Sequence, residues 1–289
     1  MDTIIQILAR ELGRSEAHVE NVVRLIDEGN TIPFIARYRK ELHGAMDDTA
    51  LRTLADRLQY LRNLDKRREE VKSAIEGQGK LTEELSAAIE AAATLAEVED
   101  LYRPYRQKRR TRATVAREKG LEPLAELLFA QAADGPAPEE AAGAFIDPEK
   151  GVATAEDALQ GASDIIAERI SDDADIRKRL RELVWKKGYL VSAAAAKEPE
   201  DTVYRLYYAF RSPLNRVQGH QVLAINRGER EGVLKVSVEM DREAALIPVR
   251  RAVLNPGAPA MAFVRAAAED AYDRLIFPSV EREMRGLLT

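Results

Sequence analysis

The feature that most constrains the fold of this chain is a stripe of large apolar residues within one predicted helix. The stripe residues follow one another at steps of three, four or seven positions, which places them on one helical face: Leu51, Leu54, Leu58, Leu61, Leu64, Val71 and Ile75. Acidic and capping residues precede the stripe at positions 47–49, and Gly77 ends it. A stripe this narrow favours an antiparallel helical neighbour.

The segment that follows supplies that neighbour. Apolar residues keep the helical period over residues 85–101, and Thr94 and Glu97 have the spacing of a capping box. We therefore predict a long helical hairpin, in which the return arm packs on the striped helix.

The first 45 residues contain three shorter periodic stretches separated by stop signals. They predict a helix over residues 4–12, a second that Ser15 caps and Gly29 closes, and a third over residues 31–42 that Thr31 and Pro33 open. Three short helices in this order resemble a helix-turn-helix module.

Beyond the basic stretch discussed below, the helical period dominates again. We predict a loop at residues 133–140 and helices at residues 120–131, 141–146, 154–170, 172–188 and 220–234, and from about Pro259 to Ile276. Pro278 should kink the last helix, which then continues without a strong stop signal, as in a fragment of a longer protein. Short β-like runs at residues 189–193 and 234–240, the second with alternating Leu234, Val236 and Val238, and residues 202–208 as a further candidate, allow a small antiparallel sheet.

The predicted fold class is therefore mostly α, a multi-helix assembly with a helix-turn-helix-like amino terminus, a long helical hairpin and a possible small antiparallel sheet. At roughly 150 residues per domain, 289 residues suggest about two domains. The patterns divide the chain into a helix-turn-helix-like module at 1–45, a hairpin with a basic segment at 46–132, and a helical region at 141–289 that leads into a truncated central helix.

Composition excludes several classes of function. The net charge of -5 argues against a basic protein that coats nucleic acid, so any such contact must be local. The chain has no cysteine and three scattered histidines, which excludes disulfides and thiolate chemistry and disfavours a metal site. We predict no cofactor. No apolar run reaches membrane length, so we expect no membrane contact and a cytoplasmic protein.

One stretch departs from this acidic background. Residues 101–119 hold eight of the 44 basic residues of the chain and one of its 49 acidic residues. Tyrosines interleave the cations, as stacking platforms do in single-strand binders, and Pro104 should break the helix and hold the arginines in a loop. The candidate nucleic-acid-binding residues here are Arg103, Tyr105, Arg106, Lys108, Arg109, Arg110 and Arg112. The competing interpretation is a solvated loop whose arginines pair with acidic side chains of the same protein.

A second, weaker candidate set consists of Arg37, Arg39 and Lys40. These cations lie on the predicted third helix, where a helix-turn-helix module carries its recognition residues. Helix-turn-helix geometry also serves purely for packing, so a structural role stays open.

Catalytic constellations are sparse. The acids Asp172, Asp173 and Asp175 follow Ser171 at a predicted helix start, where carboxylates favour the helix dipole and need no metal. The histidines are far apart and no serine has a triad context. We therefore predict no catalytic residue and no metal ligand.

Several long blocks of sequence are familiar. TIPFIARYRKE at 31–41, EDLYRPYRQKRRTRATVAREKGLEPLAELL at 99–128 and EKGVATAEDALQGASDIIAERISDDADIR at 149–177 resemble the Tex family of bacterial transcription accessory proteins. The resemblance implies a bacterial nucleic-acid-binding protein without enzymatic activity. It also implies that RNase-H-like, helix-hairpin-helix and OB-fold domains follow in the longer family members.

Together these observations predict the amino-terminal region of a Tex-like protein that contacts RNA or DNA weakly and independently of sequence, or contacts the transcription machinery. The alternative is a helical scaffold that docks RNA polymerase or the RNase-H-like and OB-fold domains. A metal-dependent nuclease ranks third, because it needs clustered acids that the sequence does not offer.

Overall fold

The computed structural model describes residues 3–107, 109–196 and 202–288. The chain divides into two compact units, Met1–Tyr102 and Arg103–Thr289, which we describe separately. Both are built mainly of helices, and the second also contains a three-stranded antiparallel sheet, so the predicted fold class is confirmed.

The amino-terminal unit consists of six helices, and side-chain caps determine where most of them begin. They are α1 (Ile4–Leu12), α2 (Glu16–Asp27), α3 (Ile32–Tyr38), α4 (Asp48–Glu76), α5 (Glu83–Ala91) and α6 (Leu95–Tyr102). Thr3, Ser15 and Asp47 each accept a hydrogen bond from a backbone N–H in the first turn of α1, α2 and α4. The three short helices predicted within the first 45 residues are therefore present.

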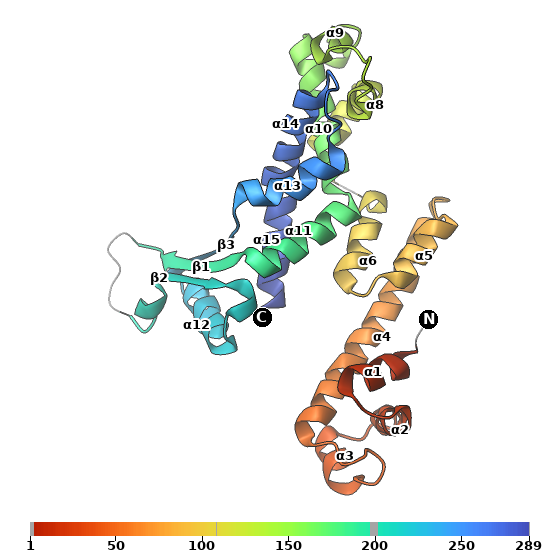
Figure 1. The fold of residues 1–289 in the computed structure, drawn as a ribbon, viewed down its shortest axis with the longest axis vertical. Helices are drawn as coiled ribbons and strands as arrows, with labels where there is room; N and C mark the ends of the chain where they lie inside the picture. Colours follow the sequence, from red (N-terminus) through yellow and green to blue (C-terminus); the bar gives the residue numbers. More distant parts are fainter. Residues whose placement is uncertain (1–2, 108, 197–201, 289) are drawn as a thin grey trace. The chain divides into compact units, whose positions relative to one another are not determined.

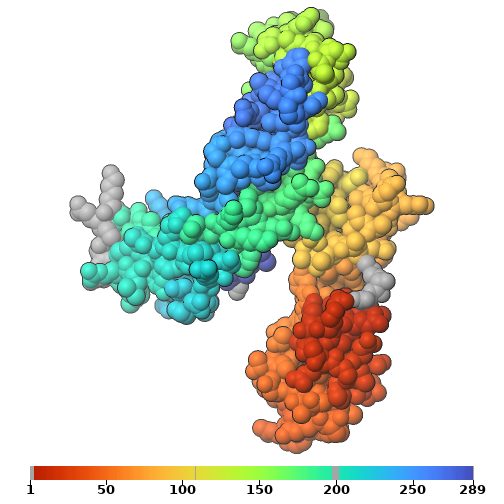
Figure 2. Space-filling view, viewed as in Figure 1, coloured from red at the N-terminus to blue at the C-terminus, as the bar shows by residue number. Residues whose placement is uncertain are grey.

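The long helix α4 organises this unit. All seven residues of the predicted stripe are buried along it. Helices α1, α2 and α3 pack against its first half, and α5 and α6 return along its second half (Figure 1). The predicted hairpin is confirmed, although its return arm consists of two helices. In the space-filling view, α1 to α4 form one closely packed body, coloured red to orange (Figure 2).

Two ion pairs hold the short helices on α4. Arg57 of α4 donates two hydrogen bonds to Glu11 of α1, at 2.7 and 2.8 Å. One helical turn further on, Arg62 forms the same bidentate contact with Asp27 of α2, also at 2.7 and 2.8 Å. The apolar contacts and these pairs together define how α1 and α2 lie on α4.

The second unit contains nine α-helices within its described residues. They are α7 (Arg112–Glu118), α8 (Glu122–Ala130), α9 (Pro138–Gly143), α10 (Ala155–Ser171), α11 (Ala174–Lys187), α12 (Gly219–Arg230), α13 (Arg242–Val253), α14 (Met261–Asp270) and α15 (Phe277–Leu287). Helix α10 is the central element, in contact with α7, α8, α9 and α14. It begins with a capping box of Thr154 and Asp157.

The sheet lies at one end of this unit (Figure 1). Its strands are β1 (Tyr189–Ala194), β2 (Ala209–Pro213) and β3 (Leu234–Glu239), with β1 in the middle and antiparallel to both neighbours. The register pairs Leu190 of β1 with Ser212 of β2 and with Val238 of β3. The first and third strands begin where the sequence predicted them.

The prediction of a strand over residues 202–208 was wrong. That segment forms a turn and a short 3₁₀ helix, Arg205–Tyr207, and β2 follows it. The Thr202 hydroxyl accepts a hydrogen bond from the backbone N–H of Tyr204 at 3.1 Å, and it also contacts the Tyr208 hydroxyl at 2.8 Å. Such local side-chain bonds stabilise a turn in competition with a strand, despite the aromatic residues of the segment.

Helices α9 and α13 differ from the sequence predictions. Helix α9 begins at Pro138, inside the predicted loop, because proline suits the first position of a helix. Helix α13 was not predicted, and it contains Pro248 in its interior. Its buried residues Ala245, Leu246 and Val249 contribute to the core of the unit, and this packing outweighs the low helix propensity of proline.

The last predicted helix continues through Pro278. A π-helical segment, Ala271–Ile276, joins α14 to α15 just before the proline. The π segment changes the hydrogen-bond register of the helix, which accommodates a residue that has no backbone N–H.

Candidate functional site

The basic segment, residues 103–112, lies between two helices. It begins with a 3₁₀ turn, Arg103–Tyr105, that contains Pro104, and it ends where α7 begins. The proline therefore ends the helical path after Tyr102, as the sequence predicted. Lys108, one of the predicted binding residues, lies outside the described residues.

The end of the segment is anchored on α10. Thr111 caps α7 by accepting a hydrogen bond from the Thr114 N–H at 3.0 Å, and its hydroxyl donates to Glu168 of α10 at 3.0 Å. Arg117 donates to the other oxygen of Glu168 at 2.7 Å. Burial is the largest single effect and disfavours the charge on Arg117, but the hydrogen bonds and charges of Glu168 and Glu122 together outweigh it and raise the pKa of the guanidinium.

Two arginines of the segment pair with acids of the same unit. The Arg103 Nε donates to Asp172 at 3.0 Å, in a contact where the aspartate side chain is only 12% exposed. Arg110 donates to Glu118 at 2.9 Å, and both of these side chains are exposed. An exposed pair of this kind contributes little stability, so Arg110 remains accessible to an outside anion.

The other arginines of the segment are directed to solvent. Arg106, Arg109 and Arg112 are exposed, whereas Tyr105 is half-buried. Within residues 3–107, 109–196 and 202–288, neither Arg109 nor Arg112 has an acidic partner. The segment thus has features of both interpretations open from the sequence: Arg103 and Arg110 pair internally, whereas Arg109 and Arg112 are exposed without an acidic partner among the described residues.

A small cavity lies beside the segment. Its volume is about 330 Å³, and the charged residues that line it are Arg103, Arg106, Arg109, Arg112, Asp164, Glu168, Asp172 and Arg274. The three acids are already engaged: Asp164 accepts from Arg274 at 3.0 Å, and Glu168 and Asp172 are bound as described above. Among the described residues, Arg109 and Arg112 are therefore lining cations without an acidic partner.

The second set of predicted binding residues, Arg37, Arg39 and Lys40, lies at the carboxy-terminal end of α3. Arg37 is exposed on the helix, but Arg39 and Lys40 follow its last residue, Tyr38. The prediction that all three lie on the third helix was therefore wrong. The backbone of Arg39 leaves the helical region at φ -131°, and its guanidinium lies 5.5 Å from the centre of the Phe34 ring. This set and the basic segment belong to different units of the chain.

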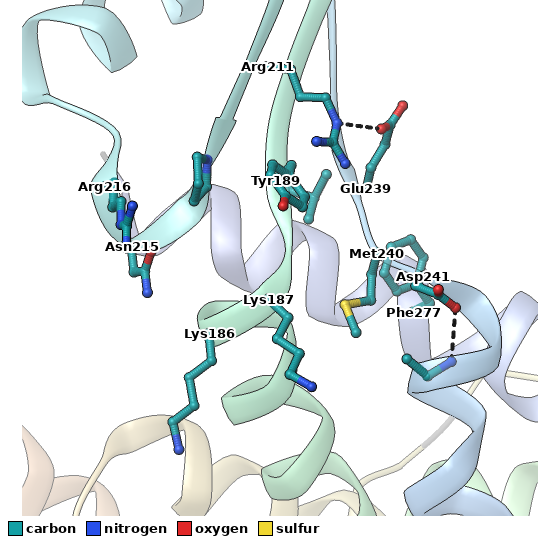
Figure 3. Close-up of a pocket in the computed structure, with 13 residues that line it drawn as sticks. Lys186, Lys187, Tyr189, Arg211, Asn215, Arg216, Glu239, Met240, Asp241 and Phe277 are labelled. Atoms are coloured by element: carbon teal, nitrogen blue, oxygen red, sulfur yellow. Dashed lines mark hydrogen bonds and ion pairs between the residues drawn. The ribbon is translucent and has the colours of Figure 1, made fainter.

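A larger cavity lies at the sheet end of the second unit (Figure 3). The sequence did not predict it. We call it the sheet cavity. Its volume is about 960 Å³, and its charged lining residues are Lys186, Lys187, Arg211, Arg216, Glu239 and Asp241. Figure 3 shows the two lysines on the last turn of α11 at one side, and Arg211 with Glu239 on the other side of Tyr189.

Four chain segments form the sheet cavity, one of which is the start of α15 with Phe277. The lysines and Tyr189 come from the junction of α11 and β1, Arg211 and Arg216 from β2 and the turn after it, and Glu239 from the end of β3. The Arg211 guanidinium stacks on the Tyr189 ring at 3.4 Å, and its Nε lies 3.5 Å from Glu239. The adjacent cations at positions 186 and 187 were the only local signal in the sequence, because the rest of the cavity depends on strand pairing.

Two of the acidic residues that follow Ser171, namely Asp172 and Asp173, have structural roles. Asp173 caps α11 by accepting from the Ile176 N–H at 2.8 Å, and Asp172 binds Arg103. In the part of the chain that the structure describes, no group of three or more His, Asp or Glu side chains could hold a metal ion. Nor does any helix among those residues have both the length and the apolar character needed to span a bilayer.

The sequence matches two known domain families. Residues 2–76 match the Tex-like protein N-terminal domain, and residues 134–289 match the Tex central region-like family. An uncharacterized protein of Bacillus subtilis, YdcI, is 45% identical over 283 residues, 97% of this chain and 39% of that protein.

Two further relatives carry descriptive names. The transcriptional accessory protein Tex of Neisseria gonorrhoeae is 41% identical over 237 residues, 82% of this chain and 31% of that protein. The human S1 RNA-binding domain-containing protein 1 is 31% identical over 302 residues, 99% of this chain and 30% of that protein. The chain thus spans well under half the length of these relatives. Because its family matches cover more than half of its residues, the chain belongs to the Tex family.

Proposed function

We propose that this chain binds single-stranded nucleic acid, weakly and independently of sequence, through the exposed arginines of the basic segment. The ligand contacts are phosphates, which Arg109, Arg112 and Arg106 meet from solvent. The chain performs no catalysis in this role and contributes contacts to a longer transcription accessory protein. Phosphate contacts of this kind carry affinity but no sequence information.

The observation that carries the proposal is that Arg109 and Arg112 are exposed and lack an acidic partner among the described residues, in a chain of net charge -5. Several other arginines of the same unit are paired, for example Arg242 with Asp273 at 2.7 Å and Arg250 with Glu269 at 2.7 Å. Cations left unpaired amid abundant acids are suited to an external polyanion. The names of two relatives, which mention transcription and RNA binding, support the same direction.

Binding of a labelled oligouridine at several salt concentrations tests this function. If three to six phosphates are contacted, the log–log slope of affinity against salt should be about -2 to -4, with a dissociation constant of about 10⁻⁴ to 10⁻⁶ M near physiological salt. The double variant Arg109→Ala/Arg112→Ala removes two contacts. We expect it to weaken binding and to flatten the slope by about 1.4, at about 0.7 per contact.

The matched control is Arg52→Ala/Lys66→Ala, which removes the same charge from two exposed positions on α4. It should leave the slope unchanged. If both double variants bind RNA as the wild type does, and the segment variant alone loses association with RNA polymerase or with the RNase-H-like and OB-fold domains added in trans, the arginines serve protein contacts instead.

A further inference from the structure

The sheet cavity contains cations that the rest of the molecule does not neutralise. Lys186, Lys187 and Arg216 are exposed and have no acidic partner within the described residues. The two acids of the lining have other partners: Glu239 lies 3.5 Å from Arg211, and Asp241 caps α13 by accepting from the Ala244 N–H at 2.9 Å. Three like charges therefore face one cavity, an arrangement that an anionic ligand would stabilise.

Other residues of the lining have a different chemistry. Met240 and Phe277 are half-buried in the lining, so part of each apolar side chain borders the cavity. Asn215 adds an amide that can both donate and accept hydrogen bonds. The Arg211 guanidinium lies 3.4 Å from the centre of the Tyr189 ring, and arginine guanidinium planes also stack on nucleobases.

The size of the cavity fits a ligand with both an anionic and a planar part. About 960 Å³ lies within the range of small-molecule pockets, about 300 to 1,000 Å³, in which a few polar groups orient a ligand against apolar walls. Lysine binds phosphate as a point charge, and the cavity places two lysines beside an arginine.

We propose that the sheet cavity binds a nucleotide, with its phosphate held by Lys186, Lys187 and Arg216 and its base placed against Arg211, Met240 and Phe277. The ligand is either a free nucleotide or one nucleotide of an RNA strand, since both present the same chemistry. This inference goes beyond the proposed function, because the site shares no residue with the basic segment and does not depend on it.

The only tryptophan of the chain provides a readout. Trp185 precedes Lys186 directly in the sequence and is half-buried. Titration of the full chain with uridine 5′-monophosphate, ribose 5-phosphate, inorganic phosphate and a short oligouridine, followed by tryptophan fluorescence and by calorimetry, compares the parts of the ligand. We expect the nucleotide to bind roughly tenfold more tightly than ribose 5-phosphate, because one base adds a stacking contact.

The variant Lys186→Ala/Lys187→Ala should weaken nucleotide binding by about tenfold or more, since charged hydrogen bonds to phosphate are lost. Lys186→Arg/Lys187→Arg should retain it. The control Arg179→Ala/Lys235→Ala removes the same charge from exposed positions of α11 and β3 that do not line the cavity, and it should bind like the wild type. The variant Arg109→Ala/Arg112→Ala separates this site from the basic segment, because nucleotide affinity should persist when those two arginines are replaced.

The other outcomes are decisive as well. If the oligouridine binds more tightly than the mononucleotide and loses that advantage in Lys186→Ala/Lys187→Ala, the strand is the ligand, whereas equal affinities identify the free nucleotide. Inorganic phosphate that binds as tightly as the nucleotide would overturn the base contact. The proposal also fails if nucleotide binding is undetectable, if both lysine-to-alanine and control variants lose it equally, or if a glutamate-rich peptide displaces the oligouridine at similar concentration.

Discussion

At the scale of single residues, a buried arginine links two helices of the second unit. Arg177 of α11 is 1% exposed and donates to Glu283 of α15 at 2.6 Å, and Arg181 donates to the other oxygen of Glu283 at 2.9 Å. Glu283→Ala should lower the free energy of unfolding by about 3 kcal/mol, because it removes a carboxylate that binds a buried cation. Urea denaturation followed by circular dichroism measures this. Arg52→Ala, in an exposed pair on α4, should leave the midpoint unchanged, and equal midpoints for all three proteins would contradict the argument.

A second residue-scale prediction concerns the junction that precedes the sheet cavity. A Cβ added at Gly188 would lie 2.5 Å from the backbone oxygen of Val184 and 3.0 Å from Leu214, so α11 can pass directly into β1 only with glycine there. We expect Gly188→Ala to destabilise the chain. Gly219→Ala is the control, since a Cβ at that position meets nothing within 4 Å. A thermal unfolding midpoint for Gly188→Ala equal to that of the control would show that the backbone shifts without cost.

At the scale of elements, the pairs that hold α1 and α2 on α4 should make the amino-terminal unit sensitive to acid. The hydrogen bonds from Arg57 and Arg62 lower the pKa of Glu11 and of Asp27 below their ordinary values of 4.5 and 3.8. A carboxylate with a lowered folded-state pKa stabilises fully above its ordinary pKa, and this contribution disappears as the pH falls through the lowered value. The unit should therefore lose stability progressively on acidification below about pH 4.5.

The double variant Arg57→Ala/Arg62→Ala tests the origin of this acid sensitivity. It should be less stable than the wild type near neutral pH and should lose less additional stability on acidification, because the partners of both carboxylates are gone. Thermal unfolding of residues 1–102 over a pH series gives the comparison. A variant curve parallel to that of the wild type at every pH would assign the acid sensitivity to other groups.

At the scale of the whole molecule, the absence of hydrolysis remains a prediction. It rests on the roles of the acids, since Asp173 caps α11 and Asp172 binds Arg103. Labelled RNA and DNA incubated with the purified chain and magnesium or manganese should stay intact. Cleavage that disappears in Asp173→Ala would demonstrate an active site and replace the proposed binding function with that of a nuclease.

The predicted division at 1–45, 46–132 and 141–289 also remains a proposal. The boundary between the two compact units falls between Tyr102 and Arg103 in the sequence. The family matches cover residues 2–76 and 134–289.

The sequence by itself determined the helical elements whose signals are local. Spacing along the chain decides which side chains share a helical face, so Leu51 to Ile75 specified α4, and the capping residues Ser15, Asp47 and Thr154 specified where helices begin. The basic segment was equally visible, because its charge is concentrated within a few positions. Strands β1 and β3 followed from short β-like runs, of which the second alternates apolar and polar residues.

Only the tertiary structure decided the features that join distant positions. Helix α13 persists through Pro248 because its buried face packs in the core, and β2 lies beyond Tyr208 because Thr202 stabilises a turn first. The division of arginines into paired and exposed ones depends on acids far along the chain, such as Asp172 for Arg103. The sheet cavity likewise requires strand pairing to bring residues near 187, 211 and 239 together. No local sequence pattern encodes contacts between such distant residues, because the free energy that stabilises these contacts comes from packing and strand pairing between segments.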